Sequence, residues 1–297
     1  MTKKTIEDRI LHGDCRKLLP LESANSVDLI VTSPPYADNR KSTYKGVRID
    51  DYVEWFLPIS EELRRVLKPR GSFVLNIKES VVNGERSTHV IELILALRQQ
   101  GWFWTEEYIW HKRNSYPGKW PNRFRDGWER CLHFTKQRDF KMYQDAVKVP
   151  IGDWAPRRLA RLSETDKSRD ASRVGSPFSK RVANWVGKTH VYPDNVIHIA
   201  TESANRGHSA AFPIGLPDYF VKLFTKRGDV VLDPFLGSGT TALAAMQLGR
   251  HYVGMELNAA YRKAACAAVA AAHDETLTAT PRTPRRKTNF TRPVTQS

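Results

Sequence analysis

Four consecutive residues, Ser33-Pro34-Pro35-Tyr36, are the first group in the chain whose types suggest chemistry. They follow residues 27–31, which have the composition of a buried strand, and a proline pair cannot continue a sheet because each ring removes a backbone donor. Since Pro35 has no N–H, the carbonyl of Pro34 is held in a fixed direction and can accept a hydrogen bond from an exocyclic amine. The Ser33 hydroxyl offers a second polar contact, and the Tyr36 ring offers a face on which a base can stack. The sequence therefore predicts a rigid turn that grips an amino group.

A second group lies in the stretch DPFLGSGTT, residues 233–241, where an apolar strand runs through a glycine turn into a helix. The turn fits the G-x-G-x-x-A fingerprint of dinucleotide sites with Gly237, Gly239 and Ala242. Glu256, at the end of the next expected strand, has the approximate spacing of an acid that binds a ribose.

Asp233 argues against a dinucleotide at this turn, because its carboxylate would repel a pyrophosphate. S-adenosylmethionine has no phosphate and carries a sulfonium and an ammonium group, so a carboxylate there could form a charge-assisted bond worth about 1 to 3 kcal/mol. The sequence therefore predicts S-adenosylmethionine as the cofactor, with Asp233 facing it and Glu256 on the ribose hydroxyls.

The elements that must position both groups form an alternating pattern, which is typical of a parallel sheet covered by helices on both faces. Strands are expected at residues 9–12, 27–31, 72–77, 107–111, 130–134, 229–232 and 251–255, and helices at 50–67, 89–100, 216–225, 240–248 and 258–273. Ligands of such a doubly wound sheet lie beyond the carboxyl ends of the strands. Both groups follow strands, so we expect them at the same edge.

The composition narrows the class of protein. The chain of 297 residues has a formal net charge of +15, which suggests a polyanionic partner such as nucleic acid, with a basic solvated surface as the alternative. No apolar run reaches the length of a membrane span, and the start of the chain lacks a signal peptide, so a cytoplasmic location is expected. The cysteines, Cys15, Cys131 and Cys266, have no metal-ligand spacing, which predicts reduced thiols and no metal site.

The pair TSPPY and DPFLGSGTT resembles the amino-group DNA methyltransferases, in the order of motifs of their β class. The stretch ILHGDC resembles that family's short acidic cofactor motif at Asp14, and AAFPIGLPDYF resembles the segment before the glycine loop, with Phe212 and Pro213 beside the cofactor. The resemblance extends over nearly the whole chain, up to residue 273. It implies an α/β fold, with a doubly wound, mostly parallel, seven-stranded Rossmann-like methyltransferase sheet.

The resemblance also implies the activity: transfer of a methyl group from S-adenosylmethionine to an exocyclic nitrogen of duplex DNA, without a covalent enzyme intermediate. It assigns catalysis to Ser33, Pro34, Pro35 and Tyr36, and cofactor binding to Asp14, Cys15, Phe212, Pro213, Asp233, Pro234, Phe235, Gly237, Ser238, Gly239, Thr240, Glu256, Leu257 and Asn258. A serine at the first catalytic position resembles the cytosine-N4 branch, whereas an aspartate there is typical of adenine-N6 enzymes. No cysteine follows a proline, so the chemistry of cytosine-C5 enzymes is rejected.

The same resemblance divides the chain. The expected parts are a catalytic half at 1–139, a target-recognition insertion at 140–205, a cofactor half at 206–273 and a basic, disordered tail at 274–297. Within the insertion, residues 156–188 hold more basic than acidic residues and little periodicity, and we expect them to be mobile. The family further suggests a cognate restriction endonuclease acting on the same site; the oligomeric state is left open.

An aromatic and basic stretch, residues 110–130, stands apart from these motifs. Its aromatic residues recur every fourth position, at Tyr116, Trp120, Phe124 and Trp128, yet the prolines and glycine between them disfavour a helix. We expect a loop whose rings either face nucleic acid or pack in a satellite core. The neighbouring His111 and His133 are expected to be ordinary strand residues.

Other functions remain open at the level of sequence. An adenine-N6 DNA methyltransferase would share the fold, and an RNA or protein methyltransferase would use the same grip on an amine. A non-catalytic DNA-binding protein could retain the same core. A nicotinamide-dependent oxidoreductase is disfavoured by Asp233 and by the lack of a clear hydride-transfer group.

Overall fold

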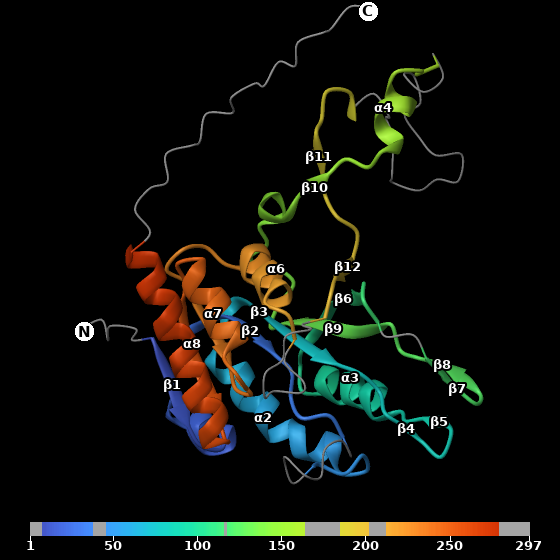
Figure 1. Cartoon of the computed structure of the whole chain (residues 1–297). Helices are drawn as coiled ribbons and strands as arrows, with labels where there is room; N and C mark the ends of the chain where they lie inside the picture. The colour runs from blue at the N-terminus through green and yellow to red at the C-terminus, as the bar shows by residue number, and fades with distance from the viewer. Residues whose placement is uncertain (1–7, 38–45, 116–117, 164–184, 202–211, 279–297) are drawn as a thin grey trace, which may run out of the picture.

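The computed structural model describes residues 8–37, 46–115, 118–163, 185–201 and 212–278. Its main sheet consists of β1 (Arg9–His12), β2 (Val27–Thr32), β3 (Leu67–Ile77), β6 (Phe103–Lys112), β9 (Trp128–Thr135), β12 (Val196–Ile199), β13 (Val230–Asp233) and β14 (His251–Glu256). The strand order is β1-β14-β13-β2-β3-β9-β6-β12 (Figure 1). Only the two pairings of β9, with β3 and with β6, are antiparallel. The predicted α/β, mostly parallel sheet is confirmed.

The sheet has eight strands in the described residues, not the predicted seven. All seven expected strands are present, and His111 and His133 lie in two of them. The eighth strand, β12, comes from the segment that the sequence assigned to the insertion, and it pairs in parallel with β6. Its four residues, VIHI, lie at positions 196–199 within that segment. The insertion therefore returns to the edge of the sheet.

The helices are α1 (Cys15–Leu18), α2 (Tyr52–Val66), α3 (His89–Gln99), α4 (Trp154–Leu159), α6 (Gly215–Phe224), α7 (Thr240–Gln247) and α8 (Ala259–Thr278), with 3₁₀ turns at Leu19–Leu21 and Gln144–Val147. Each of the five expected helices is present, and α8 continues past its expected end into the segment predicted to be a disordered tail. Residues 279–297, the rest of that tail, lie outside the described residues. None of the helices in the described part of the chain has the length and apolarity to cross a membrane.

Side chains that alternate along the strands build a core on each face of the sheet. Ile30 of β2 packs in a buried cluster with Phe56 of α2, whereas its neighbour Val31 packs in a second cluster with Phe220 of α6. All residues of β2 are buried, as expected for a central parallel strand, and each buried Ile or Leu contributes about 1.5 to 3 kcal/mol. Helices α2 and α3 thus cover one face, and α6, α7 and α8 cover the other (Figure 1).

The register places both predicted motifs at one edge. Strands β2 and β13 are adjacent and parallel, with Leu29 opposite Val231 and Ile30 opposite Leu232. The turn after β2 and the loop after β13 therefore leave the sheet side by side.

Short hairpins project from the sheet: β4 (Val81–Val82) with β5 (Glu85–Arg86), and β7 (Lys119–Trp120) with β8 (Arg123–Phe124). The pair β10 (Val149–Pro150) and β11 (His190–Val191) stands, with α4, away from the body of the protein (Figure 1). Residues 164–184, most of the segment expected to be mobile, lie outside the described residues.

Candidate active site

The turn predicted to grip an amino group begins directly after β2. Pro34 is buried, and Ser33, Pro35 and Tyr36 are half-buried. The buried Tyr52 of α2 donates its hydroxyl to the carbonyl of Pro35 at 3.0 Å, which fixes the turn on the helix. Among the described residues, none donates a hydrogen bond to the carbonyl of Pro34, so this oxygen stays available as an acceptor.

Tyr36 is anchored at its hydroxyl. The phenol donates to Oε2 of Glu129, a buried residue of β9, at 2.6 Å. At the end of β6, Nζ of Lys112 donates to the other carboxylate oxygen of Glu129 at 2.6 Å. Burial raises the pKa of Tyr36 well above its ordinary value, and the negative charge of Glu129 adds to this effect. The phenol therefore stays protonated as a donor, and its ring is held in one orientation.

Sequence reasoning missed the residues that hold Tyr36. Besides Glu129 and Lys112, the buried Asn76 of β3 lies with its Oδ1 at 3.4 Å from the Tyr36 hydroxyl, and its Nδ2 donates to the carbonyl of Arg130 at 3.1 Å. The sequence carried no signal for Glu129, which precedes the expected strand and is followed directly by Arg130. Nothing in the sequence pointed to Asn76.

The carboxylate of Asp233, at the end of β13, is hydrogen-bonded within the protein. Its Oδ1 accepts from Thr32 Oγ1 at 2.6 Å and from the N–H of Phe235 at 3.0 Å, and its Oδ2 accepts from Thr241 Oγ1 at 2.6 Å. A buried carboxylate must satisfy its oxygens, and Asp233 does so within the fold; its contact with the cofactor stays a prediction. Burial raises the pKa of Asp233 to about 6. The side chain ties β2, β13 and α7 together.

The backbone conformation of the glycine loop after β13 requires glycine at two positions. Gly237 and Gly239 have φ values of +59° and +95°, in the left-handed region that favours glycine. A Cβ on Gly239 would lie 2.8 Å from the Cβ of Ala265, so glycine is also what allows α8 to pack against the loop. Ser238 and Thr240, predicted cofactor residues, are half-buried beside these glycines.

Glu256, at the end of β14, holds the glycine loop in place. Its Oε2 accepts from the N–H of Gly237 at 2.8 Å, and its Oε1 accepts from the N–H of Asn258 at 2.7 Å. Burial raises the pKa of Glu256. Asn258 caps α8, since its Oδ1 accepts from the N–H of Ala260 at 2.9 Å. Leu257, between them, is 61% exposed.

Asp14 and Cys15 follow β1, beside the end of β14. The Asp14 carboxylate caps α1 and forms an ion pair with Arg16 at 2.6 Å, which lowers the pKa of Asp14. The Cys15 thiol is buried, and burial raises its pKa to about 12, so it is packed as a core side chain. The N–H of Gly13 donates to the carbonyl of Glu256 at 2.9 Å, which joins this motif to the end of β14.

The remaining predicted cofactor residues are apolar. Phe235 lies between the loop and α2, with its ring centroid 5.8 Å from that of Trp55, and Pro234 is buried. Pro213 is buried at the start of α6, and Phe212 is half-buried against the cluster that includes α6. In the described residues, no hydrogen bond joins Phe212 or Pro213 to the glycine loop.

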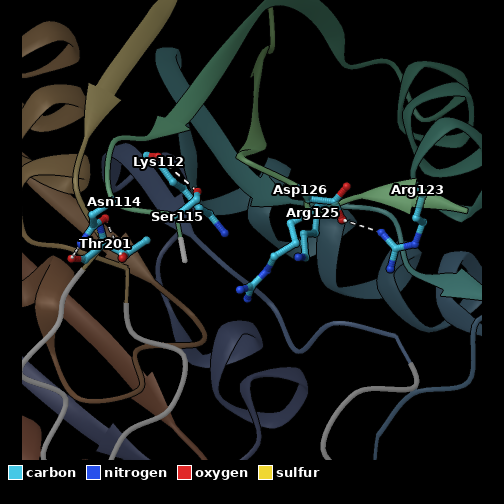
Figure 2. A pocket seen from close by; sticks show the side chains of 8 residues that line it. Lys112, Asn114, Ser115, Arg123, Arg125, Asp126 and Thr201 are labelled. Atoms are coloured by element: carbon cyan, nitrogen blue, oxygen red, sulfur yellow. Dashed lines mark hydrogen bonds and ion pairs between the residues drawn. The ribbon is translucent and has the colours of Figure 1, made fainter. Parts of the chain in front are cut away.

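A polar pocket of about 330 Å³ lies beside the catalytic turn. It is lined by Lys78, Lys112, Asn114, Ser115, Arg123, Arg125, Asp126 and Thr201. Figure 2 shows Lys112, Asn114, Ser115 and Thr201 on one side and Arg123, Arg125 and Asp126 on the other. Lys112 connects the pocket with the catalytic turn, since it also bonds Glu129. The stretch 110–130 therefore forms a hairpin and one wall of a basic pocket.

Similarity to known proteins extends over most of the chain. A family model described as DNA methylase matches residues 27–267, which contain both motifs. The chain is 28% identical over 277 residues to the type II methyltransferase M.PvuII of Proteus hauseri, covering 84% of this chain and 80% of that protein. It is 29% identical over 260 residues to the type II methyltransferase M.BglII of Bacillus subtilis, covering 86% of this chain and 66% of that protein.

Two solved structures share the fold. The PvuII DNA methyltransferase, described as cytosine-N4-specific, matches with a TM-score of 0.66 at 24% identity, covering 89% of this chain and 87% of that chain. A DNA modification methylase of Thermus thermophilus, solved with S-adenosyl-L-methionine, matches with a TM-score of 0.59 at 25% identity, covering 89% of this chain and 94% of that chain.

Proposed function

The chain belongs to the DNA methylase family, whose pattern its residues 27–267 match, and from this membership we propose that it methylates the exocyclic N4 of cytosine in duplex DNA, with S-adenosylmethionine as the methyl donor. Since its relatives include the type II methyltransferases M.PvuII and M.BglII, the proposal includes a role in DNA modification beside a restriction endonuclease for the same site. Membership of this family also removes the oxidoreductase alternative.

One observation carries the proposal: the buried hydrogen bond of 2.6 Å from Thr32 to Asp233, which are 201 positions apart in the chain. Thr32 immediately precedes Ser33, and Asp233 begins the glycine loop. The bond therefore holds the predicted catalytic turn against the predicted cofactor loop. A transfer between two bound molecules depends on such fixed relative orientation, which supplies a large part of the rate enhancement.

The groups around the glycine loop fit a cofactor that has positive charge and no phosphate. Glu256 occupies the N–H of Gly237, a donor that would face a phosphate in a dinucleotide site. Asp14, which is paired with Arg16, lies at the same edge of the sheet. In this proposal Asp14, Glu256, Phe235 and the backbone of the loop hold S-adenosylmethionine, which supplies an activated methyl group when it is bound.

The turn after β2 holds the amine in this proposal. The exocyclic nitrogen of a base is a poor nucleophile because its lone pair is delocalised into the ring. Hydrogen bonds from the amine to the Pro34 carbonyl and to the Ser33 hydroxyl favour a pyramidal, more nucleophilic nitrogen. Serine is too weak a base to remove the proton first, so the proton leaves during or after the attack. Tyr36, fixed by Glu129, presents its ring to the base that leaves the duplex.

Cytosine is the favoured base for two reasons. Ser33 stands at the position where adenine-N6 enzymes typically have an aspartate. M.PvuII, to which this chain is 28% identical, is described as cytosine-N4-specific. Adenine N6 is the alternative target, because the same fold and the same grip on an amine serve both bases.

The test is to incubate the protein with methyl-labelled S-adenosylmethionine and mixed-sequence duplex DNA, and then to identify the labelled nucleosides by mass spectrometry. N4-methylcytosine is the expected product, and sequencing of the modified DNA then gives the recognition site. N6-methyladenine would overturn cytosine as the target base, while the proposed mechanism of methyl transfer would still hold. Bound cofactor without any labelled DNA, together with labelled RNA in a parallel reaction, would overturn DNA as the substrate.

A further inference from the structure

The hairpin β7–β8 carries a feature that the proposed methyl transfer does not use. Phe124, on β8, is 88% exposed, the largest exposure among the large hydrophobic residues of the described chain. A phenylalanine in this position contributes little to the fold because almost none of its surface is buried. Trp128, four residues later, is 36% exposed, with the guanidinium of Arg130 over its ring at 5.3 Å from the centroid. The satellite core that the sequence allowed is therefore not formed by Phe124.

The surroundings of Phe124 are basic. Arg123 and Arg125, its neighbours in sequence, line the polar pocket together with Lys78 and Lys112, and Asp126 is the acid in that lining. Lys112 is paired with Glu129, so three further cations of this lining stand against one carboxylate, and this excess of positive charge suits a polyanion. Figure 2 shows Arg123 and Arg125 on the same side of the pocket.

The hairpin is held in a defined position. Arg86, on β5 of the neighbouring hairpin, forms an ion pair with Asp126 at 2.5 Å, and Arg123 lies 3.8 Å from the same carboxylate. Figure 1 shows the two hairpins next to one another at the same end of the sheet. A ring on a braced hairpin loses little conformational freedom when it stacks, which favours insertion.

We propose that β7–β8 is a DNA-inserting hairpin: Phe124 stacks on the bases at the position that the target base leaves, and the cations of the pocket hold the adjacent phosphates. This inference rests on the proposed function, because it concerns DNA bound at the same site. Extrusion of a base loses stacking and pairing, and an apolar ring that enters the vacated position restores part of the stacking. Lys112 lines the pocket and also bonds Glu129, which holds Tyr36 of the catalytic turn. In this proposal, therefore, the ring enters the duplex when the target base leaves it for the catalytic turn.

The first experiment measures turnover of Phe124→Ala on two duplexes that contain the site methylated by the wild type. One duplex is fully paired, and the other has an abasic position opposite the target base, which makes extrusion easier. We expect the variant to lose about tenfold in kcat/KM on the paired duplex and to approach the wild-type value on the abasic one.

Phe103→Ala is the matched control. Phe103 is also an exposed phenylalanine, 43%, but it lies at the start of β6, whereas Lys112 of the pocket lies at the end of that strand. This control should match the wild type on both duplexes, and Phe124→Trp should keep most of the activity. Equal losses for Phe124→Ala on both duplexes, or no loss on either, would overturn the insertion. A wild type without activity on any DNA would instead refute the proposed function.

The second experiment addresses the phosphates through the salt dependence of binding to a mixed-sequence duplex. The slope of log K against log salt is negative, and each phosphate contact adds about one to its magnitude. Arg123→Gln/Arg125→Gln should therefore make the slope less steep by about two. The charge-matched control is Arg70→Gln/Arg98→Gln, which removes two cations from the start of β3 and the end of α3. An unchanged slope for the first pair, or an equal change for both pairs, would contradict the assignment of the pocket.

Discussion

The two sides of the carboxyl edge of the sheet hold their buried carboxylates in different ways. On the cofactor side, Asp233 and Glu256 accept hydrogen bonds from hydroxyl groups and backbone N–H groups, and neither forms an ion pair with a lysine or arginine of the described chain. On the catalytic side, Glu129 accepts from the ammonium group of Lys112, and Arg130 forms ion pairs with Glu79 and Glu107.

This difference separates two kinds of ligand. The carboxylates of the cofactor side have no lysine or arginine partner in the described chain to offset their burial, and burial raises the pKa of both Asp233 and Glu256. Carboxylates with cationic partners are neutralised, so the further cations of the pocket beside them face solvent as a net positive surface. One side suits a small cation without phosphate, and the other suits a polyanion.

The largest effect should come from the pH dependence of the cofactor side. The pKa of Asp233 rises from 3.8 to about 6 on folding, so the folded chain binds more protons than the unfolded chain between these values, and stability falls as the pH rises through that range. In Asp233→Asn this titration is absent. The free energy of unfolding of the variant should therefore improve relative to the wild type by about 3 kcal/mol between about pH 4 and pH 7. Urea unfolding at several pH values measures the difference.

A control for this titration is Asp139→Asn, since Asp139 is an exposed carboxylate, 74%, in an ion pair with Arg70. We expect its difference from the wild type to change much less over the same range, because surface ion pairs contribute little. If Asp233→Asn and Asp139→Asn behaved alike, the buried carboxylate would not be the source of the pH dependence.

On the catalytic side, Ser33→Ala should lower kcat about 100-fold, which corresponds to about 2.7 kcal/mol, because it removes one contact to the reacting amine. The dissociation constant of S-adenosylmethionine should stay within about twofold, since Ser33 belongs to the turn and not to the glycine loop. Ser26→Ala is the matched control, because Ser26 lies just before β2 at its opposite end and its hydroxyl bonds only the carbonyl of Ser23 among the described residues. A parallel loss of cofactor affinity in Ser33→Ala would show that the catalytic side and the cofactor side do not act separately.

The packing of the cofactor loop can be separated from its backbone conformation by two glycine variants. Gly239→Ala strains a positive φ of +95° and also places a Cβ 2.8 Å from that of Ala265, whereas Gly228→Ala strains a φ of +81° with no atom within 4 Å. We expect Gly239→Ala to cost about 2 kcal/mol more in free energy of unfolding. Adding Ala265→Gly should recover part of the difference, since the nearest contact is lost. Equal costs for the two alanine variants would show that φ alone matters.

The same comparison explains what the sequence could predict. The cofactor side was readable because its glycines, its acid at 256 and its strand-helix-strand order lie within one short segment, whose register places them together. The hydrogen-bond partners of the Asp233 carboxylate could not be predicted, since one of them, Thr32, comes from a strand far away in the sequence. On the catalytic side, SPPY was visible, but Glu129, the partner of Tyr36, lies 93 positions away from it, and Lys112 meets Glu129 only after β6 and β9 pair. The strand β12 was missed because it lies within the segment assigned to the insertion, and its pairing with β6 brings together residues far apart in the sequence.

The smallest expected effect tests whether Tyr36 and Glu129 act as one unit. Tyr36→Phe removes the phenol that donates to Glu129 at 2.6 Å, and Glu129→Gln removes the charge that Lys112 neutralises. Each variant should lower kcat about fivefold, and the double variant should lose about as much as either one, which is a coupling energy of about 1 kcal/mol. Steady-state kinetics with labelled S-adenosylmethionine, at saturating DNA and cofactor, gives the three values of kcat.

Glu107→Gln is the matched carboxylate for this cycle, since Glu107 lies on β6 in an ion pair with Arg130 and does not bond Tyr36. Its effect should add to that of Tyr36→Phe, because the two side chains share no partner. If Glu107 and Glu129 coupled equally to Tyr36, the carboxylates of the catalytic side would act through general electrostatics. Coupling confined to Glu129 would mean that one hydrogen bond orients the ring that meets the base.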